Sequence, residues 1–233
     1  MMLMALMMLS FVFAMIIIAE EGARRICEVL LATSTINNPE NPLTEVADGS
    51  IDFENVGFSY SGPEGREALS DVNLHINSGE VIGIIGGTGS AKSTLVQLIP
   101  RLYDVTCGSV SVGGHDVREY DIDTLRSAVA MVLQKNVLFS GTIKENLLWG
   151  NPDATDEEIL EAAKLAQADS FVQTFPDKYE THIEQGGNNV SGGQKQRLCI
   201  ARALLRRPKV LILDDSTSAV DTKTDSLIRT GLT

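Results

Sequence analysis

The stretch VIGIIGGTGSAKSTL at residues 81–95 constrains the fold more than any other segment of the chain. The short apolar run at 81–85 predicts a strand buried on both faces, followed by a glycine-rich turn and a helical pattern. Within the stretch, GGTGSAKS nearly fits the phosphate-binding loop G-x-x-x-x-G-K-[ST], whose backbone N–H groups and helix dipole hold phosphate oxygens. The pattern predicts an α/β fold of the P-loop NTPase class. The alternative is a glycine-rich turn that binds nothing.

The residues of this loop have separate expected roles. Lys92 would reach the outer phosphates, and the Ser93 hydroxyl would bind Mg²⁺. Ala91 stands where the pattern has glycine. Its methyl group is harmless if φ is helical, and unfavourable if φ is positive or if phosphate crowds the Cβ. The expected nucleotide contacts in the loop are Gly87, Thr88, Gly89, Ser90, Ala91, Lys92, Ser93 and Thr94.

A second apolar run, VLILDD at 210–215, ends in two acids. An aspartate at the end of such a strand, beside a phosphate loop, holds Mg²⁺ through its water shell, and we assign this role to Asp214. Asp215 stands where an ATPase needs a base to orient the attacking water. The alternative for the acid pair is a solvated strand end or a helix cap.

The segment NVSGGQKQRLCIARALL at 189–205 predicts a second anion site. Ser191 is placed to cap a helix, and the two glycines after it expose the amides of the first turn. One domain needs a single such site for its own nucleotide, so we expect this one to complete a site on another subunit. Its residues are Ser191, Gly192, Gly193 and Gln194.

These elements, together with STSAVD at 216–221, resemble in order and spacing the nucleotide-binding domain of ATP-binding cassette (ABC) transporters. The resemblance covers nearly all of residues 51–233 and implies ATP and Mg²⁺ as cofactors. It implies that Tyr60 stacks on adenine and that Gln134 lies near Mg²⁺ and the attacking water. It also implies that Asp221 lies at a dimer interface, and that the region 132–150 senses the membrane domain.

Three positions depart from the family pattern. Asp215 replaces the usual catalytic glutamate with a stem one methylene shorter, and a misplacement of about 1 Å can cost roughly 100-fold in rate. This resembles the degenerate half of heterodimeric ABC exporters, unless backbone adjustment restores the geometry. Gln185 stands where many relatives have an acid. The switch histidine is expected after Asp221, and neither His115 nor His182 lies there.

Residues 1–19 contain 18 apolar residues, one serine and no charge, and as a helix would rise roughly 28 Å. This length predicts a membrane-spanning helix, with a buried core helix as the alternative. Arg24 and Arg25 place its far end in the cytoplasm. We expect the end of a membrane domain at 1–33 with upstream chain missing, a linker at 34–50, and a nucleotide-binding domain at 51–233, truncated before the switch histidine.

Shorter patterns complete the expected architecture of a parallel core sheet, an antiparallel side sheet and a helical subdomain. The side sheet is expected from alternating strands at 51–60, 71–76 and 109–114. Continuous apolar runs at 128–133 and 209–214 predict two more core strands. Helical patterns lie at about 142–148, 155–167 and 193–206.

Together these patterns predict the ATP-binding subunit of an ABC exporter whose own site hydrolyses ATP poorly. The expected partners are a second exporter subunit, as a heterodimer or a homodimer, the plasma membrane, and a transported small molecule or lipid. The net charge of −12 argues against nucleic acid, and Cys27, Cys107 and Cys199 are expected as reduced, structural thiols. The alternatives are a regulatory module that does not hydrolyse ATP and a soluble ABC-type ATPase.

Overall fold

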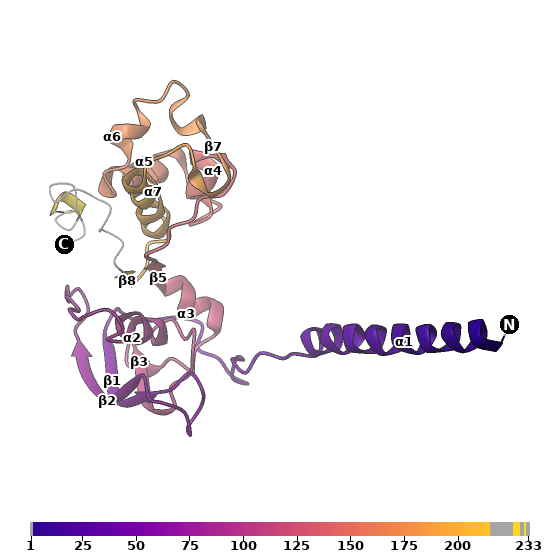
Figure 1. The fold of residues 1–233 in the computed structure, drawn as a ribbon. Coiled ribbons are helices and arrows are strands. Elements are labelled where there is room, and N and C mark those ends of the chain that lie inside the picture. Colours follow the sequence, from indigo (N-terminus) through magenta and orange to yellow (C-terminus); the bar gives the residue numbers. More distant parts are fainter. Residues whose placement is uncertain (1, 215–225, 229–230, 232–233) are drawn as a thin grey trace. The chain divides into compact units, whose positions relative to one another are not determined.

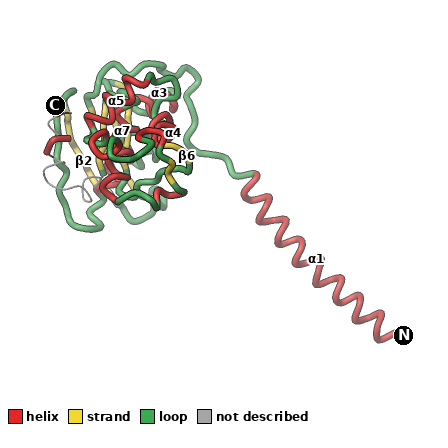
Figure 2. The backbone as a smooth tube through the Cα atoms, turned by 90° about the horizontal axis from the view of Figure 1, so that it is seen from above, coloured by secondary structure: helices red, strands yellow, loops and turns green. Residues whose placement is uncertain are grey.

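The computed structural model describes residues 2–214, 226–228 and 231, and the chain divides into two units, Met1–Asn37 and Asn38–Thr233. The first unit is dominated by α1 (Met2–Leu30), a helix without a break (Figure 2) in which no residue is buried. Its mean hydropathy of 2.7 over 18 residues makes it long and apolar enough to cross a membrane. A charged segment follows the apolar stretch within the same helix, where Glu21 pairs with Arg24 at 2.9 Å and with Arg25 at 3.5 Å.

The second unit contains the expected antiparallel side sheet. Its strands are β1 (Ile51–Phe58), β2 (Leu69–Ile76), β3 (Cys107–Val112) and β4 (His115–Asp116), in the order β2-β1-β3-β4. Phe53 of β1 lies opposite Leu74 of β2 and Val110 of β3, so one register continues across three strands. The β3–β4 turn is made by Gly113 and Gly114, both with positive φ, which glycine adopts without strain.

A parallel pair of strands forms the observed part of the core sheet. β5 (Val129–Val132) pairs in parallel with β8 (Val210–Leu213), as the two apolar runs predict. Val210 and Ile212 pack into one apolar cluster with β1, β3, α2 (Lys92–Leu98) and α3 (Ile122–Ala128). Leu211 and Leu213 pack against the other cluster, among the later helices. Because successive side chains of a strand point to opposite faces, β8 is covered on both sides.

The helical subdomain confirms the three predicted helices. α4 (Ile143–Leu148), α5 (Asp156–Leu165), α6 (Asp169–Val172) and α7 (Gly192–Leu204) lie together in Figure 1, around an apolar cluster that includes Leu147, Leu198 and Ile200. The short elements between them are β6 (Gly141–Thr142), η1 (Lys178–Glu180), β7 (His182–Ile183) and η2 (Gln185–Gly187). Capping boxes begin α4, α5 and α7, which fixes where each helix starts.

The prediction of a buried strand at 81–85 is wrong. These residues form no strand, and Val81, Ile82, Ile84 and Ile85 are exposed, Ile85 to 98%. A core strand is held by hydrogen bonds from neighbouring strands and by helices on its faces. Within the described part of the chain, the parallel sheet consists of β5 and β8, and neither pairs with this run. The run is apolar as a core strand would be, but burial also requires a neighbouring strand.

The exposed run predicts self-association. An uncovered apolar segment without charge is a template for pairing with another chain. We expect Ile85→Lys to reduce the fraction of higher oligomers in sedimentation velocity of the detergent-solubilised chain and to leave its melting temperature unchanged. The matched control is Ile212→Lys, at a residue 8% exposed, which should unfold the domain by burying an unpaired charge. Equal destabilisation by both substitutions would mean that residue 85 is buried.

Candidate functional site

The glycine-rich loop adopts the conformation that its sequence only partly favours. Gly89 has a φ of 80°, and no atom lies within 4 Å of the position that a Cβ would take there, so the space beside it is open. Ala91 has φ 59° and ψ 23°, a left-handed conformation, at the N-cap of α2 without a side-chain hydrogen bond. Left-handed geometry costs a residue with a Cβ roughly 1–2 kcal/mol. The unfavourable alternative for Ala91 therefore applies.

Lys92 closes the loop on itself. Its Nζ donates hydrogen bonds to the carbonyl oxygens of Gly86 at 2.7 Å and Gly87 at 2.9 Å, and lies 3.3 Å from Ser90 Oγ. No carboxylate is among these partners. The ammonium group is therefore held by neutral oxygens, for which the oxygens of a phosphate are stronger acceptors.

A cleft of about 680 Å³ lies beside this loop. Its lining brings together Tyr60 and most of the predicted loop contacts; Gly87 and Thr88 lie just before the lining segment. Sequence reasoning missed the other wall, Arg66, Glu67 and Ala68, which lies in the connection between β1 and β2 and matches no motif. The lining residues are Tyr60, Arg66, Glu67, Ala68, Gly89, Ser90, Ala91, Lys92, Ser93 and Thr94.

Tyr60 follows β1 at the rim of the cleft and is 55% exposed. Its hydroxyl oxygen lies 2.9 Å from Thr94 Oγ1. Its ring meets those of Phe58 and Tyr103 edge-on, with centroids 4.8 and 5.3 Å away. An aromatic side chain with an open surface therefore stands next to the phosphate loop.

Gln134 and Asp214 lie at the same end of the parallel pair. Val132 is opposite Leu213, so both residues follow the carboxyl ends of their strands, and Asp214 N donates to Val132 O at 3.0 Å. Neither lines the cleft. The phosphate loop follows the run at 81–85, which forms no strand and does not pair with β8, so no strand pairing places the loop beside Asp214. Among the described residues no cluster of three His, Cys, Asp or Glu side chains could hold a metal ion.

The predicted cap of α7 is confirmed. Ser191 Oγ accepts from Gln194 N at 3.2 Å, and Gln194 Oε1 accepts from Ser191 N at 2.9 Å. The first turn contains Gly192 and Gly193 and no acid, so the helix presents amides and a positive dipole end to an anion. Ser191 and Gly192 are exposed, and no residue of this turn lines the cleft.

The segment after β5 forms an exposed aromatic pair on a polar support. Trp149, at the C-cap of α4 and 65% exposed, stacks on Phe139 with centroids 4.7 Å apart. The buried Asn146 side chain holds the backbone of Phe139. Its Oδ1 accepts from the Phe139 N–H, and its Nδ2 donates to the Phe139 carbonyl oxygen. No sequence pattern predicts the pair, because Phe139 and Trp149 are ten positions apart in the chain.

Arg202 of α7 completes that support. Its Nε donates to Asn146 O at 2.8 Å, and its Nη1 donates to Val137 O at 3.2 Å. Burial lowers the pKa of Arg202 below its usual range. On the same helix, burial raises the pKa of the Cys199 thiol, which keeps it protonated and unreactive. The helix that begins at Ser191 is thereby joined to the aromatic pair.

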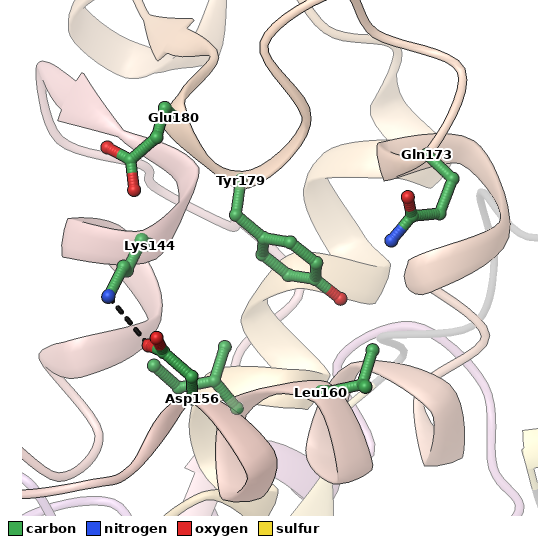
Figure 3. Close-up of a pocket in the computed structure, with 7 residues that line it drawn as sticks. Lys144, Asp156, Leu160, Gln173, Tyr179 and Glu180 are labelled. Carbon is green, nitrogen blue, oxygen red and sulfur yellow. Dashed lines mark ion pairs between the residues drawn. The ribbon is translucent and has the colours of Figure 1, made fainter.

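A second cavity, of about 270 Å³, lies among α4, α5 and η1 (Figure 3). At its rim Lys144 Nζ pairs with Asp156 Oδ1 at 2.6 Å. Tyr179 projects across it, and its hydroxyl donates to Asp169 Oδ1 at 2.9 Å. Burial and this carboxylate raise the pKa of Tyr179. None of the residues predicted from the sequence lines this cavity, and its ion pair ties α4 to α5.

Two predicted residues, Asp215 and Asp221, lie outside the residues that the structure describes. The expected base position and dimer contact therefore keep the status of sequence predictions.

Comparison with known proteins gives concordant similarities. A putative multidrug export ATP-binding/permease protein of Staphylococcus aureus (strain NCTC 8325) is 46% identical over 188 residues, 81% of this chain and 32% of that protein. A multidrug efflux ATP-binding/permease protein of Mycobacterium tuberculosis (strain H37Rv) is 46% identical over 203 residues, 87% of this chain and 17% of that protein.

A solved structure, a bacterial Atm1-family ABC exporter with ATP bound, superimposes with a TM-score of 0.84 and 32% identity, over 90% of this chain and 36% of that one. The chain thus spans about a third or less of the length of these relatives. The family model for ABC transporters matches residues 69–218, more than half of the chain. The chain therefore belongs to the ABC transporter family.

Proposed function

We propose that this chain is the nucleotide-binding part of an ABC exporter subunit, in which ATP binding and hydrolysis at a dimer interface drive transport of a small molecule or lipid. One observation supports this most directly. The chain has two separate exposed features of the kind that bind phosphate, the cleft beside Lys92 and the capped N-terminus of α7, and neither contributes a residue to the other. A nucleotide in the cleft leaves the α7 terminus free for the nucleotide of a second subunit.

The cleft supplies the groups that ATP needs. Lys92 exchanges neutral carbonyl oxygens for the charged oxygens of the outer phosphates. The backbone beside Gly87 and Gly89 is open, with nothing within 4 Å of an added Cβ, so phosphates can approach closely. Tyr60 offers its exposed ring to adenine.

Mg²⁺ would accompany the nucleotide and offset the charge that develops on the phosphates. Ser93 lines the cleft and offers a hydroxyl ligand. Asp214 and Gln134 stand at the carboxyl edge of one sheet, where ligands of α/β folds bind. Their oxygens are of the kind that Mg²⁺ prefers.

The site of this chain would hold ATP and hydrolyse it poorly, because Asp215 is one methylene shorter than a glutamate at the base position. The intact turn Ser191–Gln194 would complete a competent site on the partner, with Asp221 contacting it across the interface. A heterodimer follows from this division of labour, and a homodimer is the alternative.

The membrane location rests on α1. Its apolar part is unburied and long enough to span, and Arg24 and Arg25 follow it, which favours a cytoplasmic nucleotide-binding domain. In a multi-pass plasma-membrane subunit, the exposed pair of Phe139 and Trp149 would receive a cytoplasmic loop of the membrane domain. The support of that pair by Arg202 connects it to α7.

Ala91 should affect stability more than affinity. Its left-handed conformation strains the backbone of the folded chain, so its cost weighs on folding. We expect Ala91→Gly to raise the free energy of unfolding by up to about 1 kcal/mol, and Ala91→Val to lower it by at least about 1 kcal/mol. Urea unfolding measures both. The affinity for MgATP, from calorimetry, should change less than about twofold with glycine, and a tenfold gain would show that the methyl group crowds the phosphates.

The base position tests the proposed division of sites. In the reconstituted full-length protein, Asp215→Glu should raise steady-state ATP turnover by about 100-fold, because the carboxylate then reaches the water. Asp215→Asn serves as the inactive control, and adding Lys92→Ala to the glutamate variant should remove the gain. A wild-type rate equal to that of Asp215→Glu would refute the low-activity site. Binding without turnover in every variant would favour the regulatory module.

The aromatic pair tests coupling to the membrane domain. Trp149→Ala should increase the rate at which protease cleaves residues 34–50 in membrane vesicles, because the nucleotide-binding domain loses a docking contact. MgATP affinity should remain unchanged. Trp149→Phe, which keeps a ring to stack on Phe139, should retain protection. Equal protection in the alanine variant would exclude this surface as the contact.

A further inference from the structure

Tyr60 occupies a position that does not fix a side chain by itself. It lies beyond the end of β1 in a turn, and more than half of it is exposed. A tyrosine ring in such a place has several rotamers within reach. To present one orientation to a ligand, it needs contacts from other elements.

Three such contacts are present. The Phe58 ring meets Tyr60 at an interplanar angle of 81°, and the Tyr103 ring meets it at 88°. Phe58 and Tyr103 are themselves 5.5 Å apart, so each ring contacts the other two. Edge-on contacts are the arrangement that ring quadrupoles favour. The third contact is the hydrogen bond to Thr94, a buried residue of α2 two positions after Lys92.

The element that presents Tyr103 is itself fixed. Arg101, which is buried, pairs through Nε with Asp104 Oδ1 at 2.7 Å, and Arg126 Nη2 donates to Arg101 O at 2.9 Å. The turn after α2 thus holds Tyr103 firmly against Tyr60. No hydroxyl bond of Tyr103 contributes among the described contacts, so its ring alone performs this function.

We propose that Tyr103 is a positioning residue of the nucleotide site. Together with Thr94 it holds the Tyr60 ring at a set distance from the phosphate loop, and so makes the site select a nucleoside triphosphate over inorganic triphosphate. This rests on the proposed function, in which Tyr60 receives the base and Lys92 the phosphates. The tyrosine ring that would receive the base is thus supported by α2, the helix after the phosphate loop, and by the turn that follows α2.

The test compares two ligands that differ by the nucleoside. Dissociation constants for MgATP and for magnesium tripolyphosphate are measured by calorimetry on the whole chain in detergent. Tyr103→Leu should weaken MgATP by about 2- to 10-fold, the worth of an edge-on aromatic pair, and leave tripolyphosphate unchanged. Tyr103→Phe keeps the ring and should retain wild-type values for both ligands.

Two further variants keep the result decisive. Tyr60→Phe keeps the ring, removes the bond to Thr94, and should weaken MgATP alone, which covers the case that Tyr103→Leu fails to fold. Adding Tyr103→Leu to Tyr60→Ala should cost no further affinity, because the ring of Tyr60 is already gone. Equal losses for both ligands in Tyr103→Leu, or no loss at all, would overturn the positioning role. If the wild-type chain bound neither ligand, the proposed function itself would fail.

Discussion

The parallel pairing of β5 with β8 is the interaction on which the rest of the second unit depends. Val129 and Val210 face the cluster under the side sheet, and Val132 and Leu213 face the cluster among the later helices. The two short strands thus pack against both apolar clusters, because alternate side chains of a strand point to opposite faces. The same pair fixes Gln134 and Asp214 at one edge, and it fixes α7, which leads directly into β8.

Helices and strands that pack against other described elements could be predicted from the sequence. The spacing of their apolar residues and their capping residues are local features that set the type and the start of each element. Ser191 and Gln194 form the expected capping box, and 210–213 forms the expected buried strand. The run at 81–85 has an equally clear apolar pattern, yet it stays exposed because burial depends on partner strands. The periodicity of apolar residues predicts which face of an element is apolar. Whether that face is buried depends on which strands and helices the topology places against it. The roles of Trp149 and Tyr103 could not be predicted for a related reason. Each contacts an aromatic ring in a separate segment of the chain, and such contacts produce no recognisable spacing in the sequence.

The two features proposed to bind phosphate, the loop before α2 and the N-terminus of α7, differ in how well their residues suit the observed backbone. The α7 terminus has its cap, two glycines and no acid in its first turn, so every local preference agrees with the observed geometry. The phosphate loop has a left-handed alanine where glycine costs nothing. The position where the sequence predicts the catalytic base is Asp215, which lies outside the described residues. The residues that suit their positions poorly are thus those proposed to act on this chain's own nucleotide. That asymmetry is the physical argument for unequal sites in a pair.

The contacts of Lys92 within the loop also explain why the adenine base of a nucleotide should matter for binding. Lys92 has three hydrogen-bond partners in the loop. A phosphate would replace these contacts with stronger ones, so the net free energy of binding at Lys92 is only the difference between the new contacts and the old. Tyr60, by contrast, has an exposed side chain beside the cleft, and contacts within the protein with Phe58, Tyr103 and Thr94 set its orientation. A preorganised surface loses little freedom on binding. Discrimination between nucleotides and other polyphosphates is therefore expected to come from the aromatic side of the cleft, and charge attraction from the lysine side.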